Sequence, residues 1–470
     1  MKKFLSLFLI FLLLFPFPGY SLLSLEEEEK IGKEILQEAS KQIEFIEDLE
    51  IGAYLEKLGE ILVQKGIKVS PFHFRFFLLK DKTFNAFSVP GGYIFLNAGI
   101  FDTVNTEAEL VSILAHEMAH NLSRHVARRL ESIKKMQLAL TAATLAALIL
   151  GGGEIGQAVG ITGAAVAETK LLAYSRADEE EADRIGFEIL IQAGYTPQAV
   201  VQVMEKLSRQ SSLAIALNYK YLLTHPLPSE RLSYLYSLVE KYSSNQGKTF
   251  LVSPDEVYFK RIKIKAKIWS EEASELIPRY KLQLSQSYDP WVHYALALTL
   301  AQKRFYSEAI TEMLKVLSQL PPKNYLRLDL AEIYLMAGKW EEAIKILQDL
   351  NFETSNSSEI QKVLYLKQQY LLARALGETG KLTLAYRIFK DLSLESILKN
   401  NLYFYFYLGK ICSSLAKDGE AHFYFGKFYE IKGDFRTALF HYRKALSFLS
   451  KTDKMYLEAK EFIEKIEKKR

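Results

Sequence analysis

Residues 106–129 read TEAELVSILAHEMAHNLSRHVARR and predict one helix that carries the chemistry of the chain. Its central residues, His116-Glu117-Met118-Ala119-His120, place two imidazoles four positions apart, so both lie on one face and can bind the same metal ion. Glu117 lies about 100° further round the helix, toward the same cleft but at a different position. Two nitrogen ligands beside a carboxylate indicate a zinc hydrolase, in which Glu117 takes a proton from a bound water.

Two histidines at this spacing also arise by chance, so the prediction depends on a third ligand. The acidic run 178–183, Asp-Glu-Glu-Glu-Ala-Asp, begins another predicted helix that extends to about Ala193. Of its three glutamates, only Glu179 has a carboxylate one turn further along its own face, Asp183. Because a zinc-bound histidine usually donates its second ring N–H to a carboxylate, this spacing favours Glu179 as ligand and Asp183 as acceptor. The alternative is an acidic helix N-terminus that only complements the helix dipole.

A further histidine, His125, follows the motif by five residues. On a continuing helix its side chain points about 140° away from His120. The four residues between them include no glycine, which would be needed to turn the chain back. We therefore expect His125 to be a surface or packing residue and not a ligand.

Short segments before the metal helix predict a small sheet. Residues 72–79 and 86–89 have the composition of strands, and Pro90-Gly91-Gly92 makes a turn into 93–97, so the last two strands are expected to form a hairpin. Two roles stay open for Tyr93, Ile94, Phe95, Leu96 and Asn97. They form either the core of the sheet or an edge strand beside the metal, onto which an extended substrate adds as another strand.

The composition and the N-terminus indicate an exported protein of two or three domains. The chain has 470 residues, 49% of them hydrophobic, and its net charge of +4 includes no basic tract, which argues against nucleic-acid binding. Residues 1–21 predict a cleavable signal peptide, because their apolar run is shorter than the about 20 residues of a membrane anchor. The single cysteine, Cys412, cannot form an internal disulfide, which is typical of a large periplasmic protein.

Residues 138–167 form an apolar insertion between the two predicted metal helices. Its first run, 138–150, is followed by Gly151-Gly152-Gly153 and then by a second run of small residues. Neither run is long enough to cross a bilayer as a helix. We expect a hairpin that packs on its own domain or covers the cleft as a lid, and the alternative is an element that contacts a membrane surface.

The C-terminal half predicts a separate all-α domain at 253–470, after a linker at 243–252. Ser253-Pro254-Asp255-Glu256 is expected to cap its first helix, with proline at the first position. Ala309 and Ala343 lie 34 residues apart, and each follows another alanine, Ala297 or Ala331, by 12 residues. This period is typical of tetratricopeptide (TPR) repeats, which stack into a concave protein-binding surface, and the alternative is an irregular helical bundle.

Taken together, the motifs resemble the gluzincin peptidases of metallopeptidase family forty-eight, which includes HtpX-type and Oma-type proteases. The resemblance is carried by 116–120, by 179–186, by the strand segments 85–99 and by the His-Pro segment 224–232, which is similar to that of the periplasmic BepA-like branch. It covers roughly half of the chain. It implies an α+β, mainly helical metallopeptidase domain with a small sheet at 22–242, followed by the TPR-like domain.

For the site, the resemblance implies one Zn²⁺ per chain, bound by His116, His120 and Glu179. Glu117 is then the catalytic base and Asp183 orients a ligand. His225 precedes a proline, which biases it out of a helix and onto a loop that can reach the metal. In the BepA-like branch the corresponding histidine is expected to occupy the fourth metal position at rest, and the alternative is that it stabilises the oxyanion in an open site.

The function implied by the resemblance is that of a zinc-dependent endopeptidase of the bacterial periplasm. Its clients are expected to be unfolded or misassembled outer-membrane proteins, some degraded and others chaperoned, with the repeats binding substrates or the outer-membrane assembly machinery. The alternative class is a non-enzymatic chaperone or scaffold whose metal site is structural.

Overall fold

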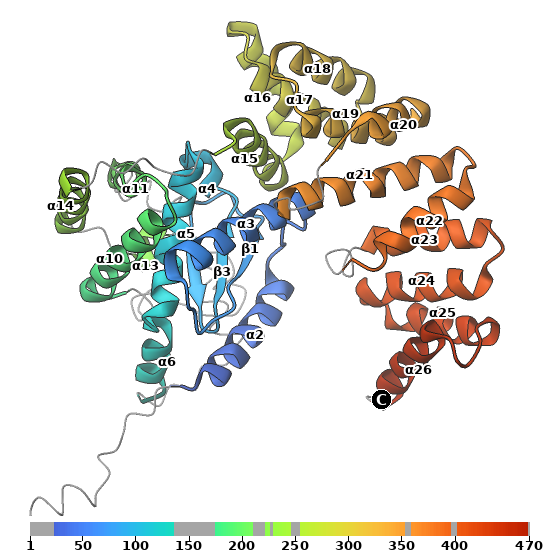
Figure 1. Ribbon diagram of the computed structural model, residues 1–470, viewed down its shortest axis with the longest axis horizontal. Coiled ribbons are helices and arrows are strands. Elements are labelled where there is room, and N and C mark those ends of the chain that lie inside the picture. Colours follow the sequence, from blue (N-terminus) through green and yellow to red (C-terminus); the bar gives the residue numbers. More distant parts are fainter. Residues whose placement is uncertain are drawn as a thin grey trace, which may run out of the picture. The chain divides into compact units, whose positions relative to one another are not determined.

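Figure 1 shows the computed structural model of the chain, which describes residues 23–135, 174–209, 221–225, 229–245, 254–352, 359–395 and 402–468. The predicted signal segment, the insertion 138–167 and most of the predicted linker lie outside these residues. The chain divides into two compact units, Met1–Glu47 with Leu55–Ser270, and Asp48–Tyr54 with Glu271–Arg470.

The elements up to Ser270 are mainly helical with a small sheet, as predicted. They are α2 (Leu25–Gln42), α3 (Leu49–Ile61), the π-helix η1 (Leu62–Ile67), β1 (Arg75–Leu79), β2 (Ala86–Val89), β3 (Tyr93–Asn97), α4 (Ile100–Thr103), α5 (Glu107–Leu122), α6 (His125–Lys135), α10 (Arg176–Gln192), α11 (Gln198–Arg209), α13 (Tyr221–Thr224), α14 (Ser229–Asn245) and α15 (Glu256–Ser270).

Side-chain caps start the helices that position the site. Helix α10 begins at a capping box in which Ser175 and Asp178 each accept the other's backbone N–H at 3.1 Å. At the start of α5 the box is incomplete, because Thr106 accepts from the Glu109 N–H at 3.2 Å while the Glu109 carboxylate accepts from Asn105 instead. These local hydrogen bonds fix where both metal-site helices begin.

The sheet has the strand order β1-β3-β2. Strands β2 and β3 form the predicted antiparallel hairpin, and both glycines of its turn, Gly91 and Gly92, have a left-handed φ of 84°. Strand β1 pairs with β3 in parallel, with Phe77 opposite Phe95. One face of the sheet is covered by α2 and α6, where Ile35 and Val126 belong to the same core as Phe95.

Of the two roles that the sequence leaves open for Tyr93, Ile94, Phe95, Leu96 and Asn97, this strand order corrects the edge-strand alternative. Strand β3 is hydrogen-bonded on both sides, and all five residues are buried. No backbone edge is therefore left there for a substrate strand, and the alternative role as sheet core holds. The local sequence specifies the hairpin, but the addition of β1 on the other side is a non-local pairing that the hairpin pattern does not specify.

The long helix predicted for 106–129 is broken. Helix α5 ends at Leu122 and α6 begins at His125, because Arg124 adopts a left-handed φ of 55°. The Arg124 side chain is held by α2, with Nε donating to Glu28 at 2.6 Å, and by the backbone carbonyl of Leu23. These long-range contacts stabilise a left-handed turn at a position where no glycine is present.

The boundary between the units follows Ser270, so α15 belongs to the first unit and the predicted linker at 243–252 does not separate the domains. Helix α15 packs on α4, where Lys263 donates to the Val104 carbonyl at 2.7 Å and Lys267 pairs with Asp102 at 2.5 Å. Its N-terminal cap is Asp255, which accepts from the Tyr258 N–H, so the helix starts two residues beyond the proline.

The second unit is an all-α series of helices that pack pairwise along the chain. They are α16 (Ala273–Gln286), α17 (Pro290–Gln302), α18 (Tyr306–Gln319), α19 (Asn324–Met336), α20 (Trp340–Asp349), α21 (Glu359–Glu378), α22 (Leu382–Leu392), α23 (Leu402–Ser414), α24 (Asp418–Ile431), α25 (Phe435–Phe448) and α26 (Lys454–Glu467). Successive helices run back and forth in Figure 1.

The small residues that predict the repeats lie where paired helices meet. Ala297 of α17, Ala309 of α18, Ala331 of α19 and Ala343 of α20 are all fully buried. The 34-residue period therefore corresponds to two successive helix pairs, and the prediction of a helical-repeat domain is confirmed. Among the described helices of both units, none is long and apolar enough to cross a membrane.

Candidate metal centre

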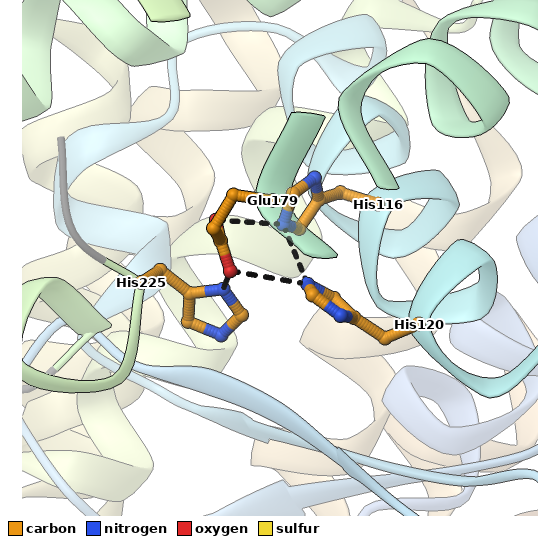
Figure 2. Close-up of side chains that lie close together, drawn as sticks. All are labelled: His116, His120, Glu179 and His225. Atoms are coloured by element: carbon orange, nitrogen blue, oxygen red, sulfur yellow. Dashed lines mark hydrogen bonds and ion pairs between the residues drawn. The ribbon is translucent and has the colours of Figure 1, made fainter. Parts of the chain in front are cut away.

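Four donor side chains from three parts of the first unit converge on one point (Figure 2). Helix α5 contributes His116 and His120, α10 contributes Glu179, and His225 follows the last residue of α13. Their ligand atoms lie within 4.8 Å of one another, and all four residues are buried. Within the described residues this is the one group of three or more potential ligands that lies so close.

The spacing of the donors fits a single ion. The Nε2 atoms of His116 and His120 lie 3.0 Å apart, and they lie 3.6 Å and 3.4 Å from the carboxylate oxygens of Glu179. Two donors at about 2.1 Å from a tetrahedral ion stand about 3.4 Å apart. His225 closes the set, with Nδ1 at 2.9 Å from Glu179 Oε1. Nitrogen and oxygen donors in this arrangement are those that Zn²⁺ accepts.

Glu117 lies beside these four donors, and its carboxylate accepts no hydrogen bond from the described residues. Both of its oxygens and Nε2 of His225 are buried and have no hydrogen-bond partner among the residues that the structure describes. The nearest of these atoms, Glu117 Oε1 and His225 Nε2, are 3.6 Å apart. Burial raises the pKa of the Glu117 carboxyl. Buried polar atoms without partners indicate a place for water, an ion or a substrate group.

The charges around the ligand carboxylate keep it ionised. Burial alone would raise the pKa of Glu179, but the imidazoles of His225, His116 and His120 hold it well below its usual range. Arg231 of α14 adds a guanidinium, with Nη1 at 2.5 Å from Glu179 Oε2. A buried carboxylate that is anionic before it meets a cation is suited to bind one.

His116 is oriented from behind by Asp183, one helical turn beyond Glu179. Its Nδ1 lies 3.1 Å from Asp183 Oδ1, which leaves Nε2 directed at the other donors. Asp183 in turn accepts two hydrogen bonds of 2.8 Å from Arg231. The structure thus places Asp183 where the spacing on the helix predicts it.

His125 is buried and lies close to the centre, so of the two predicted alternatives, a surface or a packing residue, the structure excludes the surface position. The turn at Arg124 brings its ring behind His120, where the two Nδ1 atoms lie 2.8 Å apart. Its Nε2 lies 3.1 Å from Glu181. His125 is outside the group of four donors, as predicted, but it touches one of them.

Two tyrosines hold the imidazoles in place from the side. The ring of Tyr174 stacks on His120 with centroids 3.8 Å apart, and that of Tyr221 stacks on His225 at 4.1 Å. The backbone N–H of Tyr174 donates to the Thr224 carbonyl at 2.9 Å, which ties the start of α10 to the His225 segment. A narrow, mostly apolar pocket opens beside His225, lined by Phe87, Val126 and Leu130 among others.

The structure therefore brings together His116, Glu117, His120, Glu179, Asp183 and His225. The sequence analysis missed Arg231, Tyr174 and Tyr221, and it left open whether His125 lies on the surface. For Arg231 a signal existed, because two buried carboxylates with no cation other than the metal imply a basic partner. For the tyrosines the sequence holds no signal beyond their closeness to the motifs.

Two family models match separate parts of the chain. Residues 52–239 match the model of peptidase family M48, and residues 300–364 match a tetratricopeptide repeat model. The first match contains every residue of the candidate centre, and the second covers helices α18 to α20, with the alanine pair Ala309 and Ala343.

Characterised relatives are similar over most of the chain. The beta-barrel assembly-enhancing protease of Yersinia pestis is 28% identical over a match of 422 residues that covers 79% of this chain and 85% of the relative. The protein of the same name from Escherichia coli K12 is 26% identical over 76% of this chain and 81% of its own length. The mitochondrial metalloendopeptidase OMA1 of Schizosaccharomyces pombe is 29% identical over 37% of this chain and 49% of its own.

Proposed function

The chain is a metallopeptidase that carries a peptidase family M48 domain and a C-terminal TPR domain, and from this premise we propose that it is a periplasmic zinc endopeptidase acting on unfolded or misassembled outer-membrane proteins. One observation carries the catalytic part of the proposal. The Glu117 carboxylate has no hydrogen-bond partner among the described residues and lies beside four buried donors, so a proton acceptor and a metal site share one cleft. The chain's similarity to the beta-barrel assembly-enhancing proteases supports the choice of client.

In this proposal His116, His120 and Glu179 hold one Zn²⁺ per chain. The bound ion supplies a Lewis acid that polarises the scissile carbonyl and lowers the pKa of water. Glu117 accepts a proton from the attacking water and returns it to the leaving amine. Asp183 and Arg231 keep the His116 ring directed at the centre. Burial of all these groups excludes bulk water and strengthens their electrostatic interactions.

His225 has a separate role, which is to complete the ligand set at rest. Four protein ligands are typical of a closed zinc site, whereas catalysis needs an open position. The contact of His225 Nδ1 with Glu179 at 2.9 Å supports this role. Release of His225 from the ion would then open this position for water and substrate. The competing role, stabilisation of an oxyanion, predicts instead that His225 is needed for turnover.

The variant Glu117→Gln tests the proposed base. We expect it to bind Zn²⁺ as the wild type does and to lose cleavage of an unfolded protein such as casein by about 10²-fold or more. Glu188→Gln is the matched control, because Glu188 lies on the exposed side of α10 with 61% of its side chain accessible. Undiminished cleavage by Glu117→Gln contradicts the assigned base. No cleavage by wild-type protein loaded with zinc favours a structural metal site instead.

The variant His225→Ala separates the two roles of that residue. Under the resting-ligand role it weakens zinc binding and raises the basal rate of cleavage. Under the oxyanion role it leaves zinc affinity nearly unchanged and lowers the rate. If neither zinc affinity nor rate changes, His225 regulates nothing at this site.

For the cellular setting, the proposal places the chain in the periplasm and assigns the TPR domain to recognition of clients or of the outer-membrane assembly machinery. Stacked helical repeats of this kind bind proteins and peptides. Large hydrophobic side chains such as Phe440 and Phe448 are more than half exposed on α25, which supports a binding role with or without cleavage. Fractionation of cells that express the full chain, followed by cross-linking of Glu117→Gln to trapped clients, tests both parts. Recovery in the cytoplasm contradicts the setting.

A further inference from the structure

The Nδ1 atom of each histidine ligand points away from the other donors. That of His116 faces a carboxylate, and that of His120 faces another histidine. His116 Nδ1 lies 3.1 Å from Asp183 Oδ1, whereas His120 Nδ1 lies 2.8 Å from Nδ1 of His125. Both neighbours are buried, with His125 only 2% exposed. Each of the two histidine ligands therefore has one close partner on the ring nitrogen that points away from the centre.

The contact continues beyond His125 to two carboxylates of α10. His125 Nε2 lies 3.1 Å from Glu181 Oε2 and 3.6 Å from Asp178 Oδ1. Arg128, one turn along α6 from the turn at Arg124, lies 3.4 Å from Asp178 and 3.6 Å from Glu181. His125 thus spans the space between the ligand ring and carboxylates that His120 does not reach itself.

The chemistry of imidazole allows one arrangement of protons along the row His120, His125 and Glu181. With a metal on Nε2, His120 carries its hydrogen on Nδ1 and donates it, so Nδ1 of His125 must be the acceptor. A neutral imidazole that accepts at Nδ1 carries its own hydrogen on Nε2, and this N–H faces Glu181. The row ends at an anionic carboxylate, which is the acceptor that fixes the direction of both hydrogen bonds.

We infer that His125 is a positioning residue that holds the ring and the tautomer of His120 and thereby sets the affinity of the centre for its metal. Helix α10 then serves both histidine ligands, His116 directly through Asp183 and His120 through His125 with Glu181 and Asp178. The inference rests on the metal-binding part of the proposed function and not on cleavage. It also gives a role to the acidic residues of α10 that are not ligands.

The test is the zinc affinity of the full chain, measured by competition with a chromophoric chelator. His125→Leu introduces an apolar side chain of similar size and removes the acceptor, and we expect zinc binding to weaken about 10- to 100-fold. His125→Asn places an amide oxygen near the position of Nδ1, and we expect it to recover most of that loss. Glu181→Gln should weaken binding less than His125→Leu, while Glu180→Gln, an exposed neighbour on α10, serves as the control with no change.

Melting of each metal-free variant shows whether it is folded, so a failure to fold is recognised before affinity is compared. Equal losses in His125→Leu and His125→Asn mean that His125 only packs, and unchanged zinc affinity in His125→Leu overturns the inference. Because zinc affinity is measured without a substrate, a wild-type chain that binds zinc and cleaves nothing removes the proposed function while this inference stands.

Discussion

Arg231 donates two hydrogen bonds of 2.8 Å to Asp183, one to each carboxylate oxygen, and its third nitrogen lies 2.5 Å from Glu179. One guanidinium from α14 therefore pairs with two buried carboxylates on α10 and offsets one of their two negative charges. Planar bidentate pairs of this kind are among the strong hydrogen bonds of proteins. Removal of the arginine leaves both carboxylates buried without that cation.

We predict that Arg231→Met lowers the free energy of unfolding of the metal-free protein by about 3–5 kcal/mol, the usual loss for a broken buried ion pair. Zinc should restore part of this loss, because the ion supplies positive charge next to Glu179. Denaturant unfolding in chelator and in saturating zinc measures both effects. Arg184→Met is the control, because the Arg184 side chain is half exposed and its pair with Glu188 is long, at 3.7 Å. A loss of equal size in the control contradicts the assignment.

Gly186 lies where α10 packs against the backbone of α5 at His116. A methyl group on this residue would stand 3.1 Å from both the Cα and the backbone nitrogen of His116, and backbone atoms inside a helix cannot move aside alone. We predict that Gly186→Ala destabilises the fold by about 1–3 kcal/mol and weakens zinc binding. Gly52→Ala is the matched control, because nothing lies within 4 Å of its added carbon, and it should be neutral or stabilising by up to about 1 kcal/mol. Chemical unfolding and zinc titration of both variants decide the point.

Glu56 of α3 predicts a pH dependence of stability that is independent of the metal site. Burial raises its pKa from 4.5 to about 7, although its carboxylate accepts from the Phe76 N–H at 3.2 Å. Between these two pKa values the folded chain holds a proton that the unfolded chain has lost, so the free energy of unfolding falls as pH rises through this window. We predict that the wild type loses on the order of 2 kcal/mol of unfolding free energy between about pH 4.5 and about pH 7, and that Glu56→Gln does not show this loss.

Unfolding curves of the wild type and Glu56→Gln at about pH 5 and about pH 8 measure this difference. Glu26, an exposed glutamate of α2, gives the control variant Glu26→Gln. If the wild type and Glu56→Gln lose the same stability over this range, the buried carboxyl does not titrate as predicted.

A histidine pair in the second unit predicts the opposite slope at lower pH. Nδ1 of His422 on α24 lies 3.0 Å from Nδ1 of His441 on α25, and burial lowers the pKa of both rings. Asp418 and Lys444 also face His422, with opposite effects on its charge. Below about pH 6.5 the unfolded chain takes up protons that the folded pair resists, so the second unit should lose stability as pH falls. His441→Asn should flatten this dependence in melts of the full chain, and His73→Asn, at an exposed histidine, should not.

Much of the fold could be predicted because its signals are local. Ser24 and Ser175 start their helices through hydrogen bonds to residues three positions away, and the sequence contains both partners. The helical repeat follows from the spacing of Ala309 and Ala343, since a small residue at each helix contact produces a period in the sequence. The motif 116–120 and the pair Glu179 and Asp183 depend on the geometry of single helices.

What could not be predicted depends on residues far apart in the sequence. The turn at Arg124 is held by Leu23 and Glu28, roughly a hundred positions away, so no local pattern announces the end of α5 or the position of His125. In the same way, β3 is central because β1 pairs with it from a distance. Arg231 lies 48 residues beyond Asp183 and reaches the centre from α14, which packs on α11.

Helix α10 provides a metal ligand in Glu179, the acceptor for His116 in Asp183, and the carboxylates behind His125. These groups lie on one rigid helix, so they move together relative to α5. A small slide or rotation of α10 changes the coordination and the orientation of both imidazoles at the same moment. The centre is therefore expected to behave as an all-or-none unit, assembled or dismantled as a whole, in which ligand strength and ligand alignment cannot be adjusted one without the other.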